Sequence, residues 1–168
     1  MDIELVPVTA EGRQVLANLM QLYLHDFSEL DNRELSADGT FGYPWFDAYF
    51  TSPAREPYLI RVAGRPAGFA LVRCDVAGDE GAWNVSEFFV VRRYRRQGVA
   101  ATAARLLFQR HPGPWTLAYL HHNTAAARLW PALAAAVADG AVRHEEQQPP
   151  AVPLAKSRLR FEVPVATV

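Results

Sequence analysis

The chain of 168 residues is half hydrophobic and 21% charged, which suits one well-buried core, so we expect a single domain over residues 1–168. The amino-terminal stretch carries charges where a signal peptide needs an apolar run, and no segment approaches the roughly 20 apolar residues of a membrane span. The single cysteine, Cys74, can form no internal disulfide, so we expect a cytoplasmic protein in a reducing compartment.

The net charge of −1 conceals an uneven distribution of charge along the chain. Residues 1–50 hold nine acidic residues against two arginines, a balance of −7, whereas residues 88–138 hold seven arginines and no acidic residue. We therefore expect the first region to suit a cationic ligand and the second an anionic one.

The amino-terminal half predicts a strand, two helices and three antiparallel strands. IELVPV has the pattern of a short strand, and the apolar residues of 11–30 keep helical spacing. A polar, glycine-containing loop follows, with a short helix near 45–50. Three apolar runs at 58–63, 66–75 and 82–91 then indicate an antiparallel meander. The third run is nearly continuous in apolar residues, as in a central strand covered on both faces.

The carboxy-terminal half alternates helices with strands. The apolar period becomes helical from Gly98 until His111-Pro112, and WTLAYL is then typical of a strand. A second helix runs from Asn123 to about residue 137, and AVRHEE and RLRFEVPV form a final strand pair. The order strand, helix, helix, three antiparallel strands, helix, strand, helix, two strands predicts an α/β (α+β) sandwich with a mixed sheet.

The segment VVRRYRRQGVAATAARLL joins the predicted central strand to an amphipathic helix. Backbone N–H groups at a helix amino terminus lack intrahelical partners, and the helix dipole adds partial positive charge, so a diphosphate can bind there. Gly98, Ala100 and Ala101 remove side chains that would keep phosphate oxygens away. Arg95 and Arg96 add charge-assisted contacts. The alternative is an ordinary strand-to-helix turn with exposed arginines.

With this motif the chain resembles the GNAT superfamily of N-acetyltransferases, whose acetyl-CoA diphosphate loop follows the pattern Arg/Gln-x-x-Gly-x-Gly/Ala after a central strand. Arg95, Gly98 and Ala100 match this pattern. Downstream, the segment from Asn123 to Trp130 resembles the family's Asn-x-x-Ala-x-x-Phe-Tyr segment. Most of the chain is also similar to a poorly described subgroup of these acetyltransferases, through YLHDFSEL and EFFVVRRYRRQG.

The resemblance implies a GNAT-type fold, acetyl-CoA as cofactor and a set of residues that bind it. The family holds the pantetheine arm and the thioester carbonyl through backbone N–H groups of a bulged central strand. Its Asn contacts the pantetheine arm, although Asn123 also suits the simpler role of a helix N-cap. The expected cofactor-binding residues are Val90, Val91, Arg95, Arg96, Gln97, Gly98, Val99, Ala100, Ala101, Asn123 and Trp130.

Acetyl transfer to an amine needs a neutral nucleophile and a proton for the leaving thiolate. Glu87 is the leading candidate for a general base, because it is a lone carboxylate in an apolar strand; a strand-edge or salt-bridged glutamate is the alternative. The family's general acid is a Tyr at the end of the second motif, but Trp130 stands there in this chain. Either water protonates the thiolate or another side chain does so, and the candidates are Tyr119, which we select, Tyr94, His121 and His122.

The acidic segment around Asp26 and Glu29 lies where, in the family, the first two helices wall the acceptor site. By this resemblance the two carboxylates attract a cationic amine; a solvated helix end is the alternative. His121 and His122 are neighbours on a strand end and would point opposite ways, so we expect no metal site.

We therefore expect an N-acetyltransferase that carries the acetyl group of acetyl-CoA to a primary amine by direct attack in a ternary complex. One alternative is an acyl-CoA-binding module that has lost turnover. The other is a nucleic-acid-binding protein that uses the arginines of 92–96, which the near-neutral net charge disfavours. We expect no nucleic-acid or membrane partner, and a monomer or homodimer.

Overall fold

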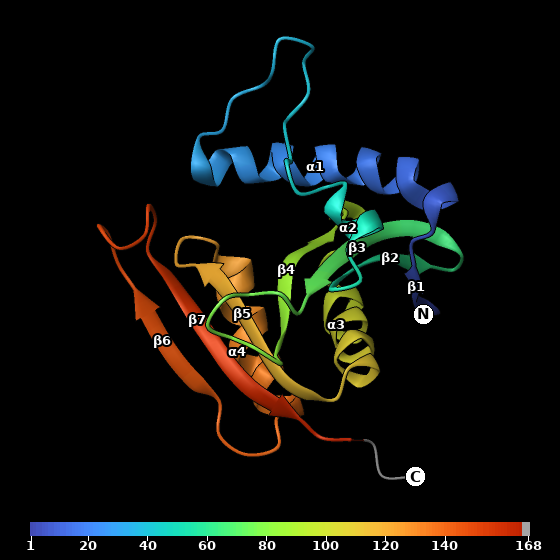
Figure 1. Cartoon of the computed structure of the whole chain (residues 1–168). Helices are drawn as coiled ribbons and strands as arrows, with labels where there is room; N and C mark the ends of the chain where they lie inside the picture. Colours follow the sequence, from blue (N-terminus) through green and yellow to red (C-terminus); the bar gives the residue numbers. More distant parts are fainter. Residues whose placement is uncertain (166–168) are drawn as a thin grey trace. The chain divides into compact units, whose positions relative to one another are not determined.

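Seven strands form one mixed sheet in the computed structural model, which describes residues 1–165 (Figure 1). They are hydrogen-bonded in the order β1-β2-β3-β4-β5-β7-β6. The strands are β1 (Ile3–Pro7), β2 (Arg55–Val62), β3 (Arg65–Arg73), β4 (Trp83–Val90), β5 (Gly113–Leu120), β6 (Arg143–Gln147) and β7 (Lys156–Val163). The helices are α1 (Arg13–Asp31), α2 (Ala48–Thr51), α3 (Val99–Arg110) and α4 (Thr124–Val137), with 3₁₀ turns η1 (Ala10–Gly12) and η2 (Arg92–Tyr94).

The predicted order of strands and helices is confirmed, apart from the two 3₁₀ turns, which the sequence did not indicate. Each turn has only three residues, too few to show a periodic apolar pattern. The sheet is mixed because β4 pairs with β5 in parallel, whereas the pairs β1 with β2, β5 with β7 and β6 with β7 are antiparallel.

Strands β2, β5 and β7 begin two or three residues earlier than predicted, and β3 begins one residue earlier. β2 begins at Arg55. Because Arg55 and Glu56 are both polar, the spacing of apolar residues does not predict that the strand begins there. β5 begins at Gly113 and includes Pro114, which lies opposite Glu162 of β7. Gly and Pro usually mark turns, so the sequence placed the start of this strand later.

The described residues group into two compact units, each made of two stretches of chain. The first contains Met1–Val72 and Glu87–Ala100, and the second contains Arg73–Ser86 and the chain from Ala101 onward.

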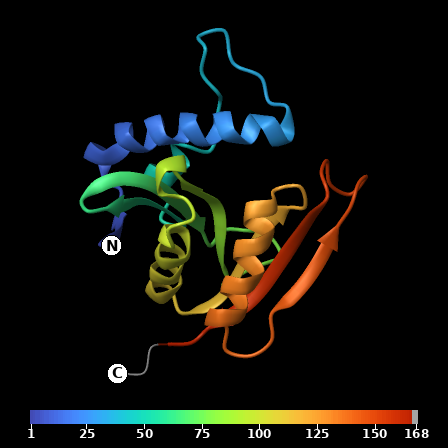
Figure 2. The same ribbon diagram turned by 180° about the vertical axis from the view of Figure 1, so that it is seen from behind.

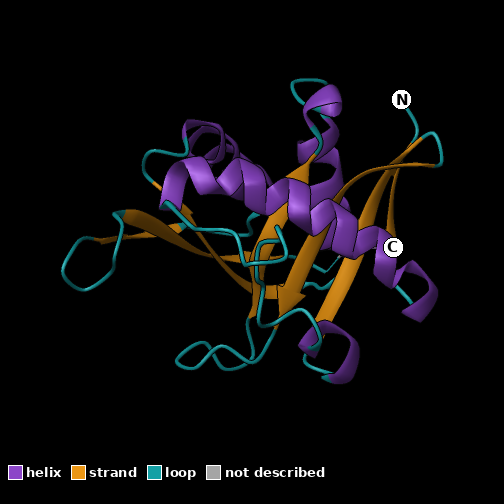
Figure 3. Cartoon of the chain, turned by 90° about the horizontal axis from the view of Figure 1, so that it is seen from above, coloured by secondary structure: helices purple, strands orange, loops and turns teal. Residues whose placement is uncertain are grey.

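In the first unit, α1 packs its apolar face on strands β2, β3 and β4. The helix has 19 residues, and its buried side chains recur at helical spacing, which is why the sequence pattern predicts it. Figure 3 shows the long helix lying across the strands. Among residues 1–165, no helix is both long and apolar enough to cross a membrane. The strand residues that meet α1 in this core are Leu59, Phe69, Leu71 and Phe89.

Strand β3 passes so close to β4 at Gly68 that no other residue fits there. A Cβ at this position would lie 2.0 Å from the carbonyl oxygen of Phe89, a backbone atom that cannot turn aside as a side chain can. Beside this contact, the Val91 N–H donates to the carbonyl oxygen of Ala67 at 2.8 Å. Gly68 therefore sets the path of the end of β4.

The second unit is built on β5, β7 and β6, with α4 packed on β5 and β7 (Figure 2). β7 pairs along its whole length with β5, from Lys156 to Val163. Phe108 of α3 contacts Trp115 of β5 and Phe161 of β7 edge to face, with ring centroids 4.8 and 5.3 Å apart. These aromatic contacts fasten α3 to the strands of the same unit.

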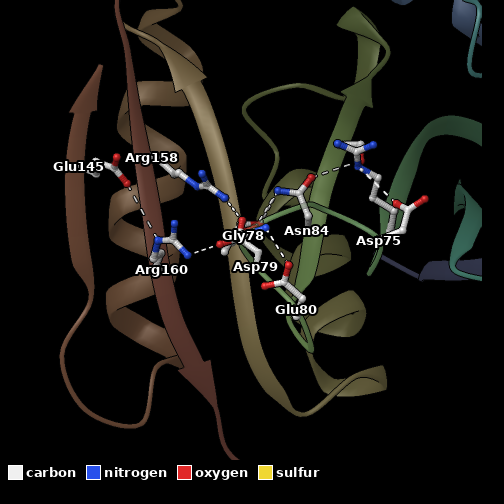
Figure 4. A network of polar contacts seen from close by, with 11 residues as sticks. Asp75, Gly78, Asp79, Glu80, Asn84, Glu145, Arg158 and Arg160 are labelled. Carbon is white, nitrogen blue, oxygen red and sulfur yellow. Dashed lines mark hydrogen bonds and ion pairs between the residues drawn. The ribbon is translucent and has the colours of Figure 1, made fainter. Parts of the chain in front are cut away.

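A polar network ties the loop between β3 and β4 to β7, also within the second unit (Figure 4). The buried carboxylate of Asp79 pairs with Arg158 and with Arg160, both on β7. Arg160 also lies 4.0 Å from Glu145 of β6. Asp79 thereby joins the loop between β3 and β4 to β7, and the pair of Arg160 with Glu145 joins β7 to β6.

Candidate active site

The segment from Arg95 to Gly98 joins the end of β4 to α3, as predicted. The turn η2 follows β4, with the Tyr94 N–H donating to the carbonyl oxygen of Val91 at 2.9 Å. Arg96 and Gly98 adopt the left-handed region, with φ of 58° and 79°. Glycine does so at no steric cost, whereas Arg96 is strained, and strained residues gather at ligand-binding sites.

This loop fits a diphosphate in its shape and its charge. A Cβ on Gly98 would meet nothing within 4 Å, so space is open in front of the backbone at that point. α3 has no acidic residue in its first turn, where helix N–H groups lack intrahelical acceptors. Val99 is buried and anchors the start of the helix, whereas residues 95–98 are exposed. The residues present therefore suit the anionic group that the sequence predicts here.

Arg95 is predicted to contact the diphosphate, yet its guanidinium is engaged within the protein. Its Nε–H donates to the carbonyl oxygen of Val90 at 2.7 Å, and its Nη2 donates to Asp26 Oδ2 at 2.5 Å. Arg92 donates to the other carboxylate oxygen of Asp26 at 2.7 Å. Burial raises the pKa of Asp26, but hydrogen bonds from Arg92 and Arg95 outweigh burial and hold it below its usual value. Asp26 is thus an anion shared by two arginines.

The other polar side chains of this loop differ in what they contact. Gln97 Nε2 donates to the carbonyl oxygen of Arg93 at 2.6 Å, which supports the backbone of the turn. The Arg93 guanidinium lies over the Tyr94 ring, 6.0 Å from its centroid. Arg96 is exposed, as is Glu29 on α1, the second residue predicted to attract the acceptor.

Val90 is the last residue of the central strand β4, and Val91 follows it. The family resemblance implies free N–H groups for the pantetheine arm at these two residues. The Val91 N–H donates to Ala67 of β3, so this donor is already used inside the sheet. The carbonyl oxygen of Val90 accepts from Arg95. The parallel register of β4 with β5 covers Trp83 to Val85, and β4 continues to Val90.

Glu87 lies half-buried on β4, and two tyrosines donate to its carboxylate. Tyr23 of α1 donates to Oε2, and Tyr43 of the loop before α2 donates to Oε1 at 3.1 Å. Burial, and after it the charge of Glu87, raises the pKa of both tyrosines above the ordinary value, so both remain protonated donors. The candidate base is thus a carboxylate on the central strand, and two phenols from other parts of the chain orient it.

Sequence reasoning missed Tyr23 and Tyr43 as partners of Glu87. They are separated from Glu87 by 64 and 44 residues, and no local pattern relates such distant positions. Tyr23 belongs to the apolar face of α1, where it counts as a core residue. The available signal was its hydroxyl, because a buried phenol needs a hydrogen-bond partner.

Four predicted site residues belong to the second unit. Asn123 is the N-cap of α4, and its Oδ1 accepts from the Ala126 N–H at 3.2 Å, which bears out the capping role. Trp130 is buried on the same helix, 7% exposed. Tyr119 is half-buried on β5, and Ala101 is half-buried on α3.

The two adjacent histidines follow β5 in the second unit. His121 Nε2 lies 2.6 Å from Glu146 Oε2 and 3.0 Å from Ser157 Oγ. Ser157 also donates to Glu146 at 2.8 Å. Within residues 1–165, no group of three or more His, Cys, Asp and Glu side chains is arranged to hold a metal ion.

The comparison with protein families finds a match over most of the chain. The model described as the Acetyltransferase (GNAT) family matches residues 16–134, which is more than half of the chain. The matched region begins within α1 and ends within α4, so it includes Glu87 and the segment 95–98. A comparison with curated protein sequences finds no match.

Solved structures share the fold over nearly the whole chain. An acetyltransferase from Thermus thermophilus has a TM-score of 0.69 at 15% identity, with 97% of this chain and 98% of that chain covered. A GNAT family acetyltransferase from Elizabethkingia anophelis with acetyl-CoA bound has a TM-score of 0.61 at 14% identity, covering 96% and 98%. The ribosomal-protein-S18-alanine N-acetyltransferase from Escherichia coli has a TM-score of 0.58 at 14% identity, covering 99% and 97%. At these identities the likeness concerns the fold.

Proposed function

Since the chain belongs to the GNAT family of acetyltransferases, we propose that it transfers the acetyl group of acetyl-CoA to a primary amine. The observation that carries this proposal is the exposed loop 95–98, with open space at Gly98. This loop leads into α3 and lies a few residues after β4, the strand that bears Glu87. The structure from Elizabethkingia anophelis, in which acetyl-CoA is bound, supports the choice of cofactor.

Acetyl-CoA, when bound, supplies an acetyl group activated as a thioester. We assign its diphosphate to the backbone N–H groups of Gly98, Val99 and Ala100, with charge added by Arg96. Ala101 follows these residues on α3 and leaves room by its small side chain. On the family pattern, Val90, Val91, Asn123 and Trp130 are the proposed neighbours of the pantetheine arm, with Val91 acting through atoms other than its N–H, which is already bonded.

Glu87 is the proposed general base. An amine is protonated at neutral pH and must lose a proton before it can attack a carbonyl carbon. Tyr23 and Tyr43 donate to the carboxylate of Glu87 and fix its orientation, so that it can accept this proton directly or through one water. Tyr119 is the proposed proton donor to the leaving thiolate, because the indole of Trp130 has no proton that it can usefully release. The acceptor is an amine, with Glu29 proposed to favour a cationic one.

The proposal is tested by measuring thiol release from acetyl-CoA with a panel of polyamines, lysine peptides, peptide amino termini and aminoglycosides. With an accepted amine, Glu87→Gln should lower kcat roughly 10²- to 10⁴-fold, the usual contribution of a general base. Its affinity for CoA should stay that of the wild type. Glu34→Gln removes an exposed carboxylate from the loop after α1 and serves as the matched control, with unchanged kcat.

Two outcomes contradict this assignment. An unchanged kcat in Glu87→Gln would remove Glu87 from the mechanism. CoA affinity without transfer to any amine of the panel would identify a binding module in place of an enzyme.

A further inference from the structure

Asp26 lies near the carboxy-terminal end of α1, and both of its carboxylate oxygens are bonded. Oδ1 accepts from Arg92 at 2.7 Å, and Oδ2 accepts from Arg95 at 2.5 Å. The Asp26 side chain is 22% exposed, against 72% for Arg92 and 41% for Arg95. The carboxylate is therefore the least exposed of the three groups, and both arginines, which lie between β4 and α3, donate hydrogen bonds to it.

Arg95 is held from further directions at the same time. Its Nε–H donates to the carbonyl oxygen of Val90, and its guanidinium lies over the ring of Phe89, 5.6 Å from the centroid. Asp26, Val90 and Phe89 are all within the first unit. Arg95 and its contacts with Asp26, Val90 and Phe89 thus form a brace, which links the turn between β4 and α3 to the end of β4 and to α1.

Arg96, the residue after Arg95, has a strained backbone conformation. Arg96 is a non-glycine residue in the left-handed region, with φ of 58°, and such a conformation persists only where the surroundings enforce it. It is followed within two residues by Gly98, where the open space for a diphosphate begins. A brace at Arg95 is therefore placed where it can hold the path of the binding loop.

We propose that Asp26 is a positioning residue for cofactor binding: by fastening Arg92 and Arg95 to α1, it holds the loop 95–98 in the conformation that binds the diphosphate of CoA. This inference rests on the proposed function. It assigns Asp26 to the cofactor side of the reaction, whereas the acidic sequence around it predicts acceptor recognition. Two positive guanidinium groups adjoin this carboxylate and offset its charge, so it attracts a cationic amine less strongly than an unpaired carboxylate does.

Three roles for Asp26 make different predictions for Asp26→Asn. If Asp26 positions the loop, the variant binds CoA more weakly. If Asp26 only competes with the diphosphate for the arginines, the variant binds CoA more tightly. If Asp26 recognises the acceptor, CoA affinity is unchanged and only the KM for the amine rises.

The test is calorimetric titration of CoA into the wild type, Asp26→Asn, Arg95→Gln and the double variant. Asp26→Asn should weaken CoA binding about five- to tenfold, the size of the coupling between directly bonded partners. The double variant should bind no more weakly than Arg95→Gln alone, because both changes break the same brace. Glu34→Gln removes one negative charge without touching the loop and should bind CoA as the wild type does.

A second readout distinguishes positioning from a general loss of structure. Amide hydrogen exchange in peptides that cover 92–98 should be faster in Asp26→Asn, while peptides from β7 keep wild-type exchange. Asp26→Glu restores a carboxylate and should recover part of the lost affinity. In turnover with an accepted amine, the KM for acetyl-CoA should rise and the KM for the amine should not.

The outcomes separate this inference from the proposed function. A wild type with no affinity for CoA overturns both. A wild type that binds CoA, with an Asp26→Asn variant that binds equally well or more tightly, overturns the positioning role alone. Unchanged exchange in 92–98 does the same.

Discussion

At the scale of single residues, the protonation states around Glu87 follow from where the side chains are buried. Tyr23 is 9% exposed, so its hydroxyl depends on the carboxylate of Glu87 as its partner. Removing a tyrosine proton there would place a second negative charge beside Glu87 in a poorly solvated place. Both effects keep Tyr23 protonated at pH values where an exposed tyrosine ionises.

Tyr23→Phe is therefore expected to change stability in two ways. At pH 7 the free energy of unfolding should fall by about 2 kcal/mol, because a hydrogen bond to a charged group is lost. Above the ordinary tyrosine pKa of 10.0, the unfolded wild type releases this proton while the folded wild type keeps it, so wild-type stability falls as the pH rises. Urea denaturation from about pH 7 to 11.5 should show a shallower alkaline fall in Tyr23→Phe than in the wild type.

The same reasoning applies to Tyr43, whose pKa is raised mainly by burial and then by Glu87. Tyr43→Phe should also flatten the alkaline fall. Parallel curves for the wild type and both variants would contradict a raised pKa for either phenol.

At the scale of elements, the carboxylate of Asp79 holds the loop between β3 and β4 against strand β7. The side chain of Asp79 is 1% exposed, and it joins this loop to two arginines of β7, whose side chains are 21% and 38% exposed (Figure 4). Burial lowers the pKa of Arg158, and the charge of Arg160 lowers it further, so Asp79 offsets two positive charges that would otherwise repel each other.

Asp79→Asn should lower the free energy of unfolding by about 2 kcal/mol. This is less than the roughly 3–5 kcal/mol for a fully buried pair, because Arg160 remains partly in water. Urea denaturation measures the difference. Glu80→Gln, in the same loop but exposed, is the matched control and should unfold as the wild type does. Equal stability of the two variants would show that the network adds nothing.

At the scale of the whole molecule, a ligand that binds only the folded chain must stabilise all of it. CoA at 100 times its Kd should add about 2.7 kcal/mol to the free energy of unfolding, which raises Tm by roughly 5–10 °C for a chain of this length. Gly98→Val should abolish most of this shift, because valine is strained at φ 79° and its side chain fills the open space. Differential scanning fluorimetry measures the shift.

Pantetheine, which lacks the diphosphate, is the matched ligand control in that experiment. It should raise Tm much less than CoA at the same concentration. A full CoA shift in Gly98→Val would place the diphosphate elsewhere on the protein.

The sequence by itself determined the order of helices and strands, the segment that joins β4 to α3 and the resemblance to the family. Each of these is written in a short window of chain: the apolar period of α1, the continuous run of β4, and the motif from Arg95 to Ala100. The bounds were less certain where polar residues occupy a strand, as at Arg55 in β2. Local physics suffices for such features because neighbours in sequence are neighbours in space.

Only the tertiary structure decided which side chains meet. The donors to Glu87, the arginines bonded to Asp26 and the approach of Gly68 to Phe89 bring together α1, the loop before α2, β3, β4 and the segment after β4. The hydrogen-bonded pairs among these are 44, 64, 66 and 69 residues apart, and their contacts depend on register and packing that no short pattern encodes. For that reason Asp26 looked in the sequence like a free acidic residue, and in the fold it accepts hydrogen bonds from two arginines of the segment between β4 and α3.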